Sequence, residues 1–218
     1  MKRLMLAALA AGVWTTACSS ATTPTPTGGA SGTSGTSTTA DAGGTSTADD
    51  AGAGSQDAAT GPFKLTSATL TEGGTFPKES TCNATPQSSM ASPPFTWTPG
   101  PPGTKSYALV LVDTSNGLAH SAMYDIPATV FELPKGVERK YQPAVPAGAK
   151  QTKAYDGVTF GYLGPCPPTG EHVYQFTLYA LDVDTLPNMT QNTDAKTCNS
   201  EAKKRALGFA TLTAKYKQ

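Results

Sequence analysis

The clearest hydrophobic pattern in the chain lies at residues 173–181, where apolar and polar side chains alternate with the period of a β-strand. Tyr174, Phe176, Leu178 and Ala180 fall on one face of that strand. Residues 106–112 (SYALVLV) are apolar on both faces, which is typical of a strand buried on both sides. Both segments are therefore predicted to be core strands.

Shorter segments separated by Gly and Pro predict further strands, at residues 63–70, 95–97, 122–126, 130–133 and 209–216. Residues 194–207 predict the one helix, with Thr193 or Asp194 available to cap its start. Its apolar side is formed by Ala195, Cys198, Ala202 and Ala206. Six or seven short strands and one late helix indicate a mainly-β domain.

The start of the chain has the pattern of an export signal. Lys2 and Arg3 precede an apolar run and small residues that end at Cys18, so residues 1–17 are predicted to be a signal peptide. The apolar run is too short to span a bilayer comfortably. A cysteine after Thr-Thr-Ala resembles a bacterial lipobox, although Thr15 stands where Leu or Val is usual. We expect Cys18 to carry lipid; a secreted protein with a free Cys18 is the alternative.

The next segment cannot form a packed core. Residues 19–61 consist almost entirely of Ser, Thr, Gly, Ala, Pro and Asp, without any aromatic residue, Lys or Arg. Such a composition buries too little apolar surface to offset chain entropy. Residues 18–61 are therefore predicted to be a lipidated cysteine and disordered linker, and residues 62–218 the folded domain. We expect an extracytoplasmic protein, and Ser19 after the cysteine favours the outer membrane, facing the periplasm, by analogy with other lipoproteins.

Charge and motifs exclude several function classes. Residues 62–218 carry 14 of the 16 Lys and Arg and 12 of the 16 Asp and Glu, which leaves a formal net charge of +2. The longest basic run, residues 203–205, is most simply a solvated helix face, so no nucleic-acid partner is expected. The chain has no Ser-centred nucleophile elbow, no HExxH and no paired-carboxylate motif. We expect no catalytic residues and no cofactor.

Candidate binding chemistry gathers around a stiff loop and two histidines. The loop at residues 161–170 (GYLGPCPPTG) has three glycines and three prolines, so it cannot be a helix or a central strand, and its glycines would let a ligand approach the backbone. His120 and His172, the only histidines in the chain, each follow a Gly-containing loop, and Asp113 ends the buried strand. If these strand ends cluster, they form a small polar pocket. The alternative is a tight turn with an incidental histidine.

Five ordered segments resemble the phosphatidylethanolamine-binding protein family, with the bacterial branch called Raf kinase inhibitor-like as the nearest. They are SPPFTW (92–97), PPGTKSYALVLVD (101–113), HSAMYDIPA (120–128), GYLGPCPPTGEHVYQFTLYALD (161–182) and ALGFATLTAKY (206–216). The resemblance implies an antiparallel β-sandwich of two sheets in a Greek-key arrangement, with few helices.

The resemblance also implies a shallow anion pocket at one end of the sandwich. The corresponding ligand-binding residues here are Asp113, His120, Gly164, Pro165, Pro168, His172 and Tyr174. Three positions depart from the family pattern: Thr114 and Ser115 replace the Pro-Asp that follows the first aspartate, Ser121 replaces Trp, and Val173 replaces Arg. These departures predict weaker or altered anion selectivity, although Asp113 and both histidines remain.

The three remaining cysteines allow one disulfide and leave one thiol free. Outside the cytoplasm a pair of them is expected to be oxidised, but spacing does not reveal which pair. Because the resemblance places Cys82 and Cys166 on loops near the pocket, it favours that pair. Cys198 would then be a small buried apolar residue on the helix.

These observations favour a non-catalytic binding protein for a small anion, either phosphate or a phospholipid headgroup, held at the membrane by its lipid. A regulator or inhibitor of a protein target such as a protease is the alternative, and a hydrolase is the least favoured class. A metal site from His120, His172 and Cys166 is not expected, since no two of them have ligand spacing on one element. A histidine partner predicts anion affinity that rises as the pH falls from about 8 to about 6.

Overall fold

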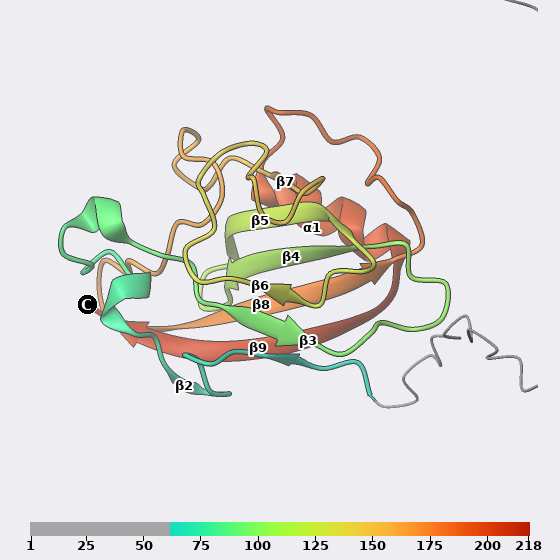
Figure 1. Ribbon diagram of the computed structural model, residues 1–218. Coiled ribbons are helices and arrows are strands. Elements are labelled where there is room, and N and C mark those ends of the chain that lie inside the picture. The colour runs from blue at the N-terminus through green and yellow to red at the C-terminus, as the bar shows by residue number, and fades with distance from the viewer. Residues whose placement is uncertain (1–61) are drawn as a thin grey trace, which may run out of the picture. The chain divides into compact units, whose positions relative to one another are not determined.

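The computed structural model describes residues 62–218, which fold into two β-sheets and one α-helix (Figure 1). The predictions for the signal peptide, Cys18 and the linker lie outside the described residues. The smaller sheet has the strand order β1-β3-β6, and the larger sheet has the order β2-β9-β8-β4-β5-β7. The prediction of a mainly-β domain with one late helix is therefore confirmed.

The larger sheet is built around the two strands with the strongest hydrophobic patterns. Strand β8 (Glu171–Leu181) pairs antiparallel with β4 (Ser106–Asp113) on one side and with β9 (Ala206–Lys217) on the other. Strand β5 (Leu118–Pro127) pairs with β4 on its far side. Strand β4 is buried on both faces along nearly its whole length, as its apolar run predicts. Strand β8, for which only one core face was predicted, is buried on both faces from Phe176 to Leu181.

One face of the larger sheet packs against the smaller sheet. Phe95 of β3 (Phe95–Trp97) lies 4.6 Å, centroid to centroid, from Phe176 of β8, and Trp97 meets Tyr107 of β4 edge-on. The predicted core face of β8 is confirmed, because Tyr174, Phe176, Leu178 and Ala180 all belong to this inter-sheet core. Burial of these aromatic side chains is the main stabilising contribution of this layer.

The opposite face of the larger sheet is covered by α1 (Ala195–Arg205). Asp194 caps this helix as predicted, because its side chain accepts a hydrogen bond of 2.8 Å from the Thr197 amide. Cys198 and Ala202 are fully buried against the sheet. Ala206, expected on the apolar side of the helix, instead begins β9, since the chain becomes extended at that residue.

The smaller sheet is shorter than the sequence suggests. The predicted strand at 63–70 forms only β1 (Leu65–Thr66), and the predicted strand at 130–133 forms only β6 (Glu132–Leu133). Both pair with the three-residue β3, which has prolines just before and after it. Prolines lack the backbone donor that a longer ladder would need, so the pairing cannot extend.

Each sheet ends on both sides in a strand of two residues. The edges of the larger sheet are β2 (Gly74–Thr75) and β7 (Lys150–Gln151), neither of which was expected from the sequence. Strand β2 runs parallel to β9, so the sheet is not entirely antiparallel as expected. Short 3-10 helices, η1 (Lys78–Ser80) and η2 (Gln87–Ser89), lie between β2 and β3. The Greek-key arrangement stays a prediction.

Strand β5 is longer than the predicted segment 122–126 and carries two bulges against β4. One bulge contains Asp125, which has a φ of 55° and accepts a hydrogen bond from the Leu186 amide at 2.8 Å. In the other, Leu111 and Val112 face Ser121 and Ala119, so His120 is the extra residue. A bulge redirects the side chain it carries, so the position of His120 follows from this irregularity. Among the described residues, no helix is long and apolar enough to cross a membrane.

Candidate functional site

The candidate site lies at one end of the inter-sheet core, where β4 ends and β8 begins. Asp113 is the last residue of β4 and is paired in register with Tyr174 of β8. His172 stands two residues before Tyr174, so alternation places both side chains on the core face of the sheet. The clustering of strand ends that the sequence predicted only conditionally is present.

Asp113 and His172 form the shortest polar contact of this cluster. The Asp113 Oδ2 atom lies 2.6 Å from His172 Nδ1, and the two side chains are 2% and 18% exposed. The second carboxylate oxygen accepts a hydrogen bond of 2.9 Å from the Ser115 amide. Because a carboxylate accepts the Nδ1 proton, Nε2 is the ring nitrogen of His172 that can bind a ligand.

His120 is buried beside this pair, with only 3% of its surface exposed. Its Nδ1 atom lies 3.1 Å from the carbonyl oxygen of Leu163. A carbonyl can only accept, so Nδ1 carries the proton and Nε2 has the lone pair in the neutral ring. Burial lowers the pKa of His120 below its ordinary value of 6.5, although the Leu163 carbonyl and the charge of Asp113 oppose that shift.

The Tyr174 ring packs against the rings of both histidines. The His120 ring meets the Tyr174 ring edge-on at 5.3 Å between centroids, and the His172 ring stacks on Tyr174 at 6.3 Å. Burial, followed by the charge of Asp113, raises the pKa of Tyr174, so its hydroxyl stays neutral. Asp113, His120, His172 and Tyr174, all predicted as site residues, therefore form one cluster.

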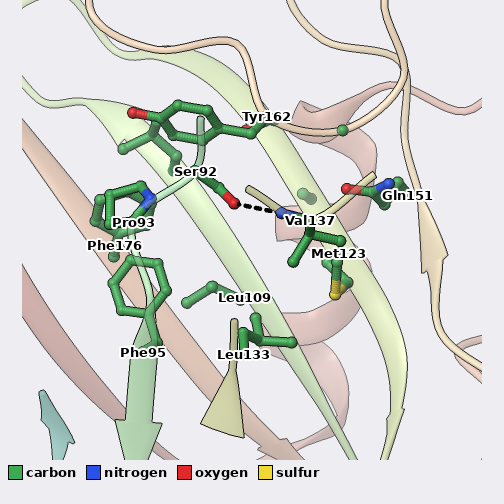
Figure 2. A pocket seen from close by; sticks show the side chains of 14 residues that line it. Ser92, Pro93, Phe95, Leu109, Met123, Leu133, Val137, Gln151, Tyr162 and Phe176 are labelled. Atoms are coloured by element: carbon green, nitrogen blue, oxygen red, sulfur yellow. Dashed lines mark hydrogen bonds between the residues drawn. The ribbon is translucent and has the colours of Figure 1, made fainter. Parts of the chain in front are cut away.

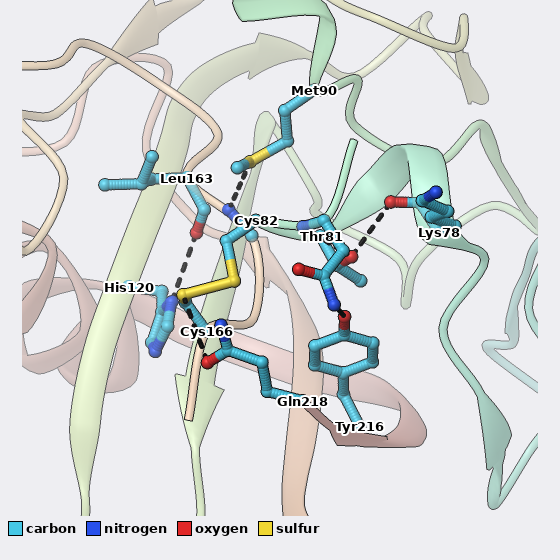
Figure 3. Close-up of a disulfide and its surroundings, with 11 residues drawn as sticks. Lys78, Thr81, Cys82, Met90, His120, Leu163, Cys166, Tyr216 and Gln218 are labelled. Atoms are coloured by element: carbon cyan, nitrogen blue, oxygen red, sulfur yellow. Dashed lines mark hydrogen bonds between the residues drawn. A yellow bond between two sulfur atoms is a disulfide. The ribbon is translucent and has the colours of Figure 1, made fainter. Parts of the chain in front are cut away.

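The loop at residues 161–170 is fixed to the segment around η1 and η2. Tyr162 donates a hydrogen bond of 2.6 Å to the Ser80 carbonyl, and the Cys82 amide donates one of 3.0 Å to the Pro165 carbonyl. Cys82 and Cys166 form a disulfide with 5.3 Å between their Cα atoms (Figure 3). The favoured disulfide is thus confirmed, as is the burial of the free Cys198 on the helix. These ties fix the Leu163 carbonyl that faces His120.

The three loop residues predicted to bind ligand differ in their surroundings. The amide of Gly164 points to the Met90 sulfur, 3.1 Å away, and a Cβ atom at this position would collide with the Ser80 carbonyl. The glycine is thus required for the approach of protein backbone, whereas we expected it to admit a ligand. Pro165 is buried, and Pro168 is exposed.

Two of the family departures fall outside the cluster. Ser121 is buried and lines a small space of about 40 Å³ between the sheets, together with Leu111 and Met123. Figure 2 shows the residues around this space. Val173 lies between His172 and Tyr174, so its side chain projects from the opposite face of β8. Contrary to our expectation, the change from Arg to Val does not remove a side chain from the face that holds His172.

Tyr155 and Leu163 contact His120 although sequence reasoning did not select them. The Tyr155 ring lies 4.6 Å from the His120 ring, and its amide donates a hydrogen bond of 3.0 Å to the His120 carbonyl. Both residues line a surface hollow of about 420 Å³ that also includes Arg139 and Asp156. The Asp-Gly pair at residues 156–157 signals a turn, but nothing in the sequence places that turn against β5.

Within residues 62–218, no group of three or more His, Cys, Asp and Glu side chains is arranged to hold a metal ion. The metal site weighed in the sequence analysis also lacks one of its ligands, because the Cys166 sulfur is bonded to Cys82. The chemistry of the cluster is that of two imidazoles, a buried carboxylate and a phenol.

Several curated proteins are similar in sequence to this chain. The UPF0098 protein YbcL of Escherichia coli is 39% identical over 102 residues, covering 44% of this chain and 55% of YbcL. A UPF0098 protein of Methanothermobacter thermautotrophicus is 32% identical over 148 residues, covering 66% of this chain and 92% of that protein. The putative lipoprotein LppC of Mycobacterium tuberculosis is 32% identical over 127 residues, covering 57% of this chain and 58% of LppC. The alignment with YbcL thus spans only about half of that protein's length.

Solved structures agree with these sequence similarities. The crystal structure of E. coli YbcL, described as a new member of the mammalian PEBP family, has a TM-score of 0.63 and 29% identity, covering 72% of this chain and 98% of YbcL. A putative PEBP homologue of Chlamydia trachomatis has a TM-score of 0.56 and 25% identity, covering 72% of this chain and 97% of that one. The family model for phosphatidylethanolamine-binding protein matches residues 66–217, which is most of the chain, so the chain belongs to the phosphatidylethanolamine-binding protein family.

Proposed function

We propose that this protein is a non-catalytic binding protein for a small phosphate-type anion, held outside the cytoplasm by an N-terminal anchor. The observation that carries the proposal is the cluster at the end of β4 and β8. There the 2.6 Å contact between Asp113 and His172 leaves Nε2 of His172 as the nitrogen available to a ligand. His120 lies against the same tyrosine ring as His172.

The two histidines offer a ligand complementary hydrogen-bonding groups. A protonated His172 keeps one N–H on Asp113 and can donate the other, from Nε2, to an anionic oxygen. His120 is neutral near pH 7 and presents a lone pair on Nε2, because its Nδ1 proton is held by the Leu163 carbonyl. The site therefore favours an oxyanion that both accepts and donates a hydrogen bond.

Partly protonated phosphate meets that requirement. A phosphate group that carries one proton has a P–O–H donor for His120 and bare oxygens for His172, and the second pKa of a phosphomonoester is about 6. Sulfate has no such proton at neutral pH and would face the His120 lone pair with an acceptor. The proposed ligand class is therefore phosphate or a phosphorylated headgroup rather than a fully ionised anion.

The proposed location outside the cytoplasm rests on the signal-peptide and lipobox patterns at the start of the chain. The similarity to the putative lipoprotein LppC supports a lipid anchor. The disulfide between Cys82 and Cys166 agrees with an oxidising compartment.

Titration calorimetry with inorganic phosphate and with sulfate tests the proposal. We expect phosphate to bind more tightly than sulfate, and phosphate affinity to rise as the pH falls from about 8 to about 6. His172→Ala removes a charge-assisted hydrogen bond and should weaken phosphate binding by about 1.5–3 kcal/mol. Thr169→Ala, an exposed change in the same loop, is the matched control and should leave the affinity unchanged.

His172→Ala also leaves the buried Asp113 carboxylate without its partner, so its folding must be checked by thermal unfolding. A second variant, His120→Asn, keeps a donor for the Leu163 carbonyl but loses the Nε2 acceptor. It should abolish the preference for phosphate over sulfate. Equal affinities of wild type and both folded variants, independent of pH, would contradict the proposed site.

A further inference from the structure

Two exposed apolar side chains stand on β9 away from the candidate site. Leu207 is 43% exposed and Phe209 is 66% exposed. Together with Lys203 of α1 they line a surface hollow of about 540 Å³ beside the helix, on the same face of the larger sheet as α1. We call these three residues the β9 patch.

The β9 patch and the candidate site occupy opposite ends of the larger sheet. Phe209 pairs in register with Tyr179 of β8, seven residues beyond His172. At about 3.3 Å per residue, that separation along the strand is roughly 23 Å. The patch is therefore not part of the anion site.

No described segment covers the β9 patch. The ring of Phe209 contacts that of Tyr179 at 6.4 Å between centroids, but its outer surface remains exposed. Single exposed apolar residues are ordinary, whereas neighbouring Leu and Phe side chains over one hollow indicate a contact surface.

One unpaired positive charge lies at the β9 patch. Lys204 and Arg205 pair with Glu201 and Asp182 at 2.6 and 2.9 Å. Lys203 forms no ion pair with another described residue.

Lys64 and Lys105 lie at the same end of the larger sheet as the β9 patch. Neither forms an ion pair with another residue in the range 62–218. The Lys105 amide donates to the Leu181 carbonyl, next to the start of β9, and the Lys64 carbonyl accepts from the Thr98 amide. Asp184, an exposed acid in the following loop, offsets one of these charges. The remaining excess is positive and suits an anionic partner.

The described chain also begins at this end of the molecule. Thr98 donates a hydrogen bond of 2.9 Å to the Pro62 carbonyl. The turn that follows Thr98 brings Pro101 against Gly208 of β9, on the face of the strand opposite to Leu207 and Phe209. Figure 1 shows the first described residues and the start of β9 at the same end, away from the C-terminus. The chain before Pro62, with the lipidation expected at Cys18, therefore joins the domain at the same end as the β9 patch.

We propose that the β9 patch is a docking surface for an anionic phospholipid bilayer. Leu207 and Phe209 would enter the interfacial region while the lysines contact lipid phosphates, which is how peripheral proteins combine apolar insertion with charge attraction. The expected anchor would raise the local concentration of bilayer at this surface. The candidate anion site would then face away from the membrane. The proposal does not depend on the anion site.

Vesicle flotation of the full-length chain with Cys18→Ser, which cannot be lipidated, tests this surface. Vesicles of phosphatidylcholine with phosphatidylglycerol are compared with phosphatidylcholine alone. The double variant Leu207→Ser/Phe209→Ser should partition at least about tenfold more weakly into the anionic vesicles. Lys203→Glu, a change at an exposed residue of the helix, should weaken binding, and higher salt should do the same.

Val158→Ser is the matched control, because Val158 is 77% exposed and lies outside the patch. It should bind vesicles like its parent, and any binding by the N-terminal apolar run is shared by all variants. Equal binding of the folded double variant and its parent would overturn the proposal. So would a concentration-dependent dimer, seen by sedimentation without vesicles and lost in the double variant, since the patch would then be an interface between copies of the chain.

Discussion

At the scale of single residues, the candidate site depends on which ring nitrogen of each histidine is already occupied. Asp113 accepts a hydrogen bond from Nδ1 of His172, and the Leu163 carbonyl accepts one from Nδ1 of His120. The two imidazoles are chemically identical, but their burial and partners make one a donor beside a carboxylate and the other a neutral acceptor. A ligand of the proposed site would therefore meet two different groups rather than two equivalent cations.

The burial of neutral His120 predicts a stability that depends on pH. Its pKa is lowered in the folded state, so between that value and 6.5 the unfolded chain binds more protons than the folded one. The free energy of unfolding should therefore be fully retained above pH 6.5 and fall as the pH decreases through the folded pKa. Asp113 and His172, the charged groups facing His120, act on its pKa in opposite directions.

His120→Asn isolates this contribution, because Asn can still donate to the Leu163 carbonyl but does not titrate. Denaturant unfolding at pH 7.5 and pH 5 would measure it. Wild type should lose more stability than the variant between the two pH values. A variant that loses as much as wild type would show that His120 does not titrate on unfolding.

The residues with the most distinctive chemistry were recognised from sequence, while their neighbours were not. Asp113, His120 and His172 stand out because each follows or precedes a strong strand or turn pattern. Tyr155 and Leu163 contact His120 although they lie 35 and 43 residues from it in the sequence, and neither stands in a recognisable local pattern. Local patterns predict local structure, and these contacts are set by the packing of loops.

At the scale of elements, the strands with long apolar patterns were predicted and the short or irregular ones were not. β3, β4, β8 and α1 agree with their predicted segments within a few residues. β2 and β7 have only two residues each, too few for any periodicity. The bulge that holds His120 is also invisible in the sequence, because it is a mismatch in register between two strands.

The disulfide joins two irregular segments whose positions depend on it, so its removal should destabilise the domain. It closes a separation of 84 residues, and the loss of such a link costs about 2–4 kcal/mol of unfolding free energy. We expect the double variant Cys82→Ser/Cys166→Ser to show that loss in denaturant unfolding. A thiol reductant should lower the stability of wild type toward that of the variant and leave the variant unchanged. If wild type and the variant were equally stable without reductant, the disulfide would not contribute to folding.

At the scale of the whole molecule, the larger sheet has a different cover on each face: the smaller sheet on one and α1 on the other. The inter-sheet layer is incompletely filled, since about 40 Å³ remains open near Leu111 and Ser121. Figure 2 shows mostly apolar side chains around this space, with Gln151 at its border. Truncating a residue that already borders a void enlarges it further.

Leu111→Ala should therefore lower the free energy of unfolding by about 2–5 kcal/mol, because Leu111 is 1% exposed and lines that space. Leu207→Ala, the same chemical change at a residue that is 43% exposed, should cost less than about 1 kcal/mol. Urea unfolding of the two variants measures both values. A large loss in Leu207→Ala would mean that Leu207 is held in the fold and is not a free surface residue.

The two-residue strands at all four sheet edges bear on how copies of this domain would behave when crowded. β1, β6 and β7 each offer only two residues for a neighbouring molecule to extend. β2, in contrast, pairs only with Ala214 and Lys215 of the twelve-residue β9, so no described strand pairs with the outer edge at the start of β9. Proteins concentrated in two dimensions meet far more often than in dilute solution, and long free edges would then seed intermolecular sheets. In crowded copies of this domain, the start of β9 is therefore the edge at which such intermolecular pairing would begin.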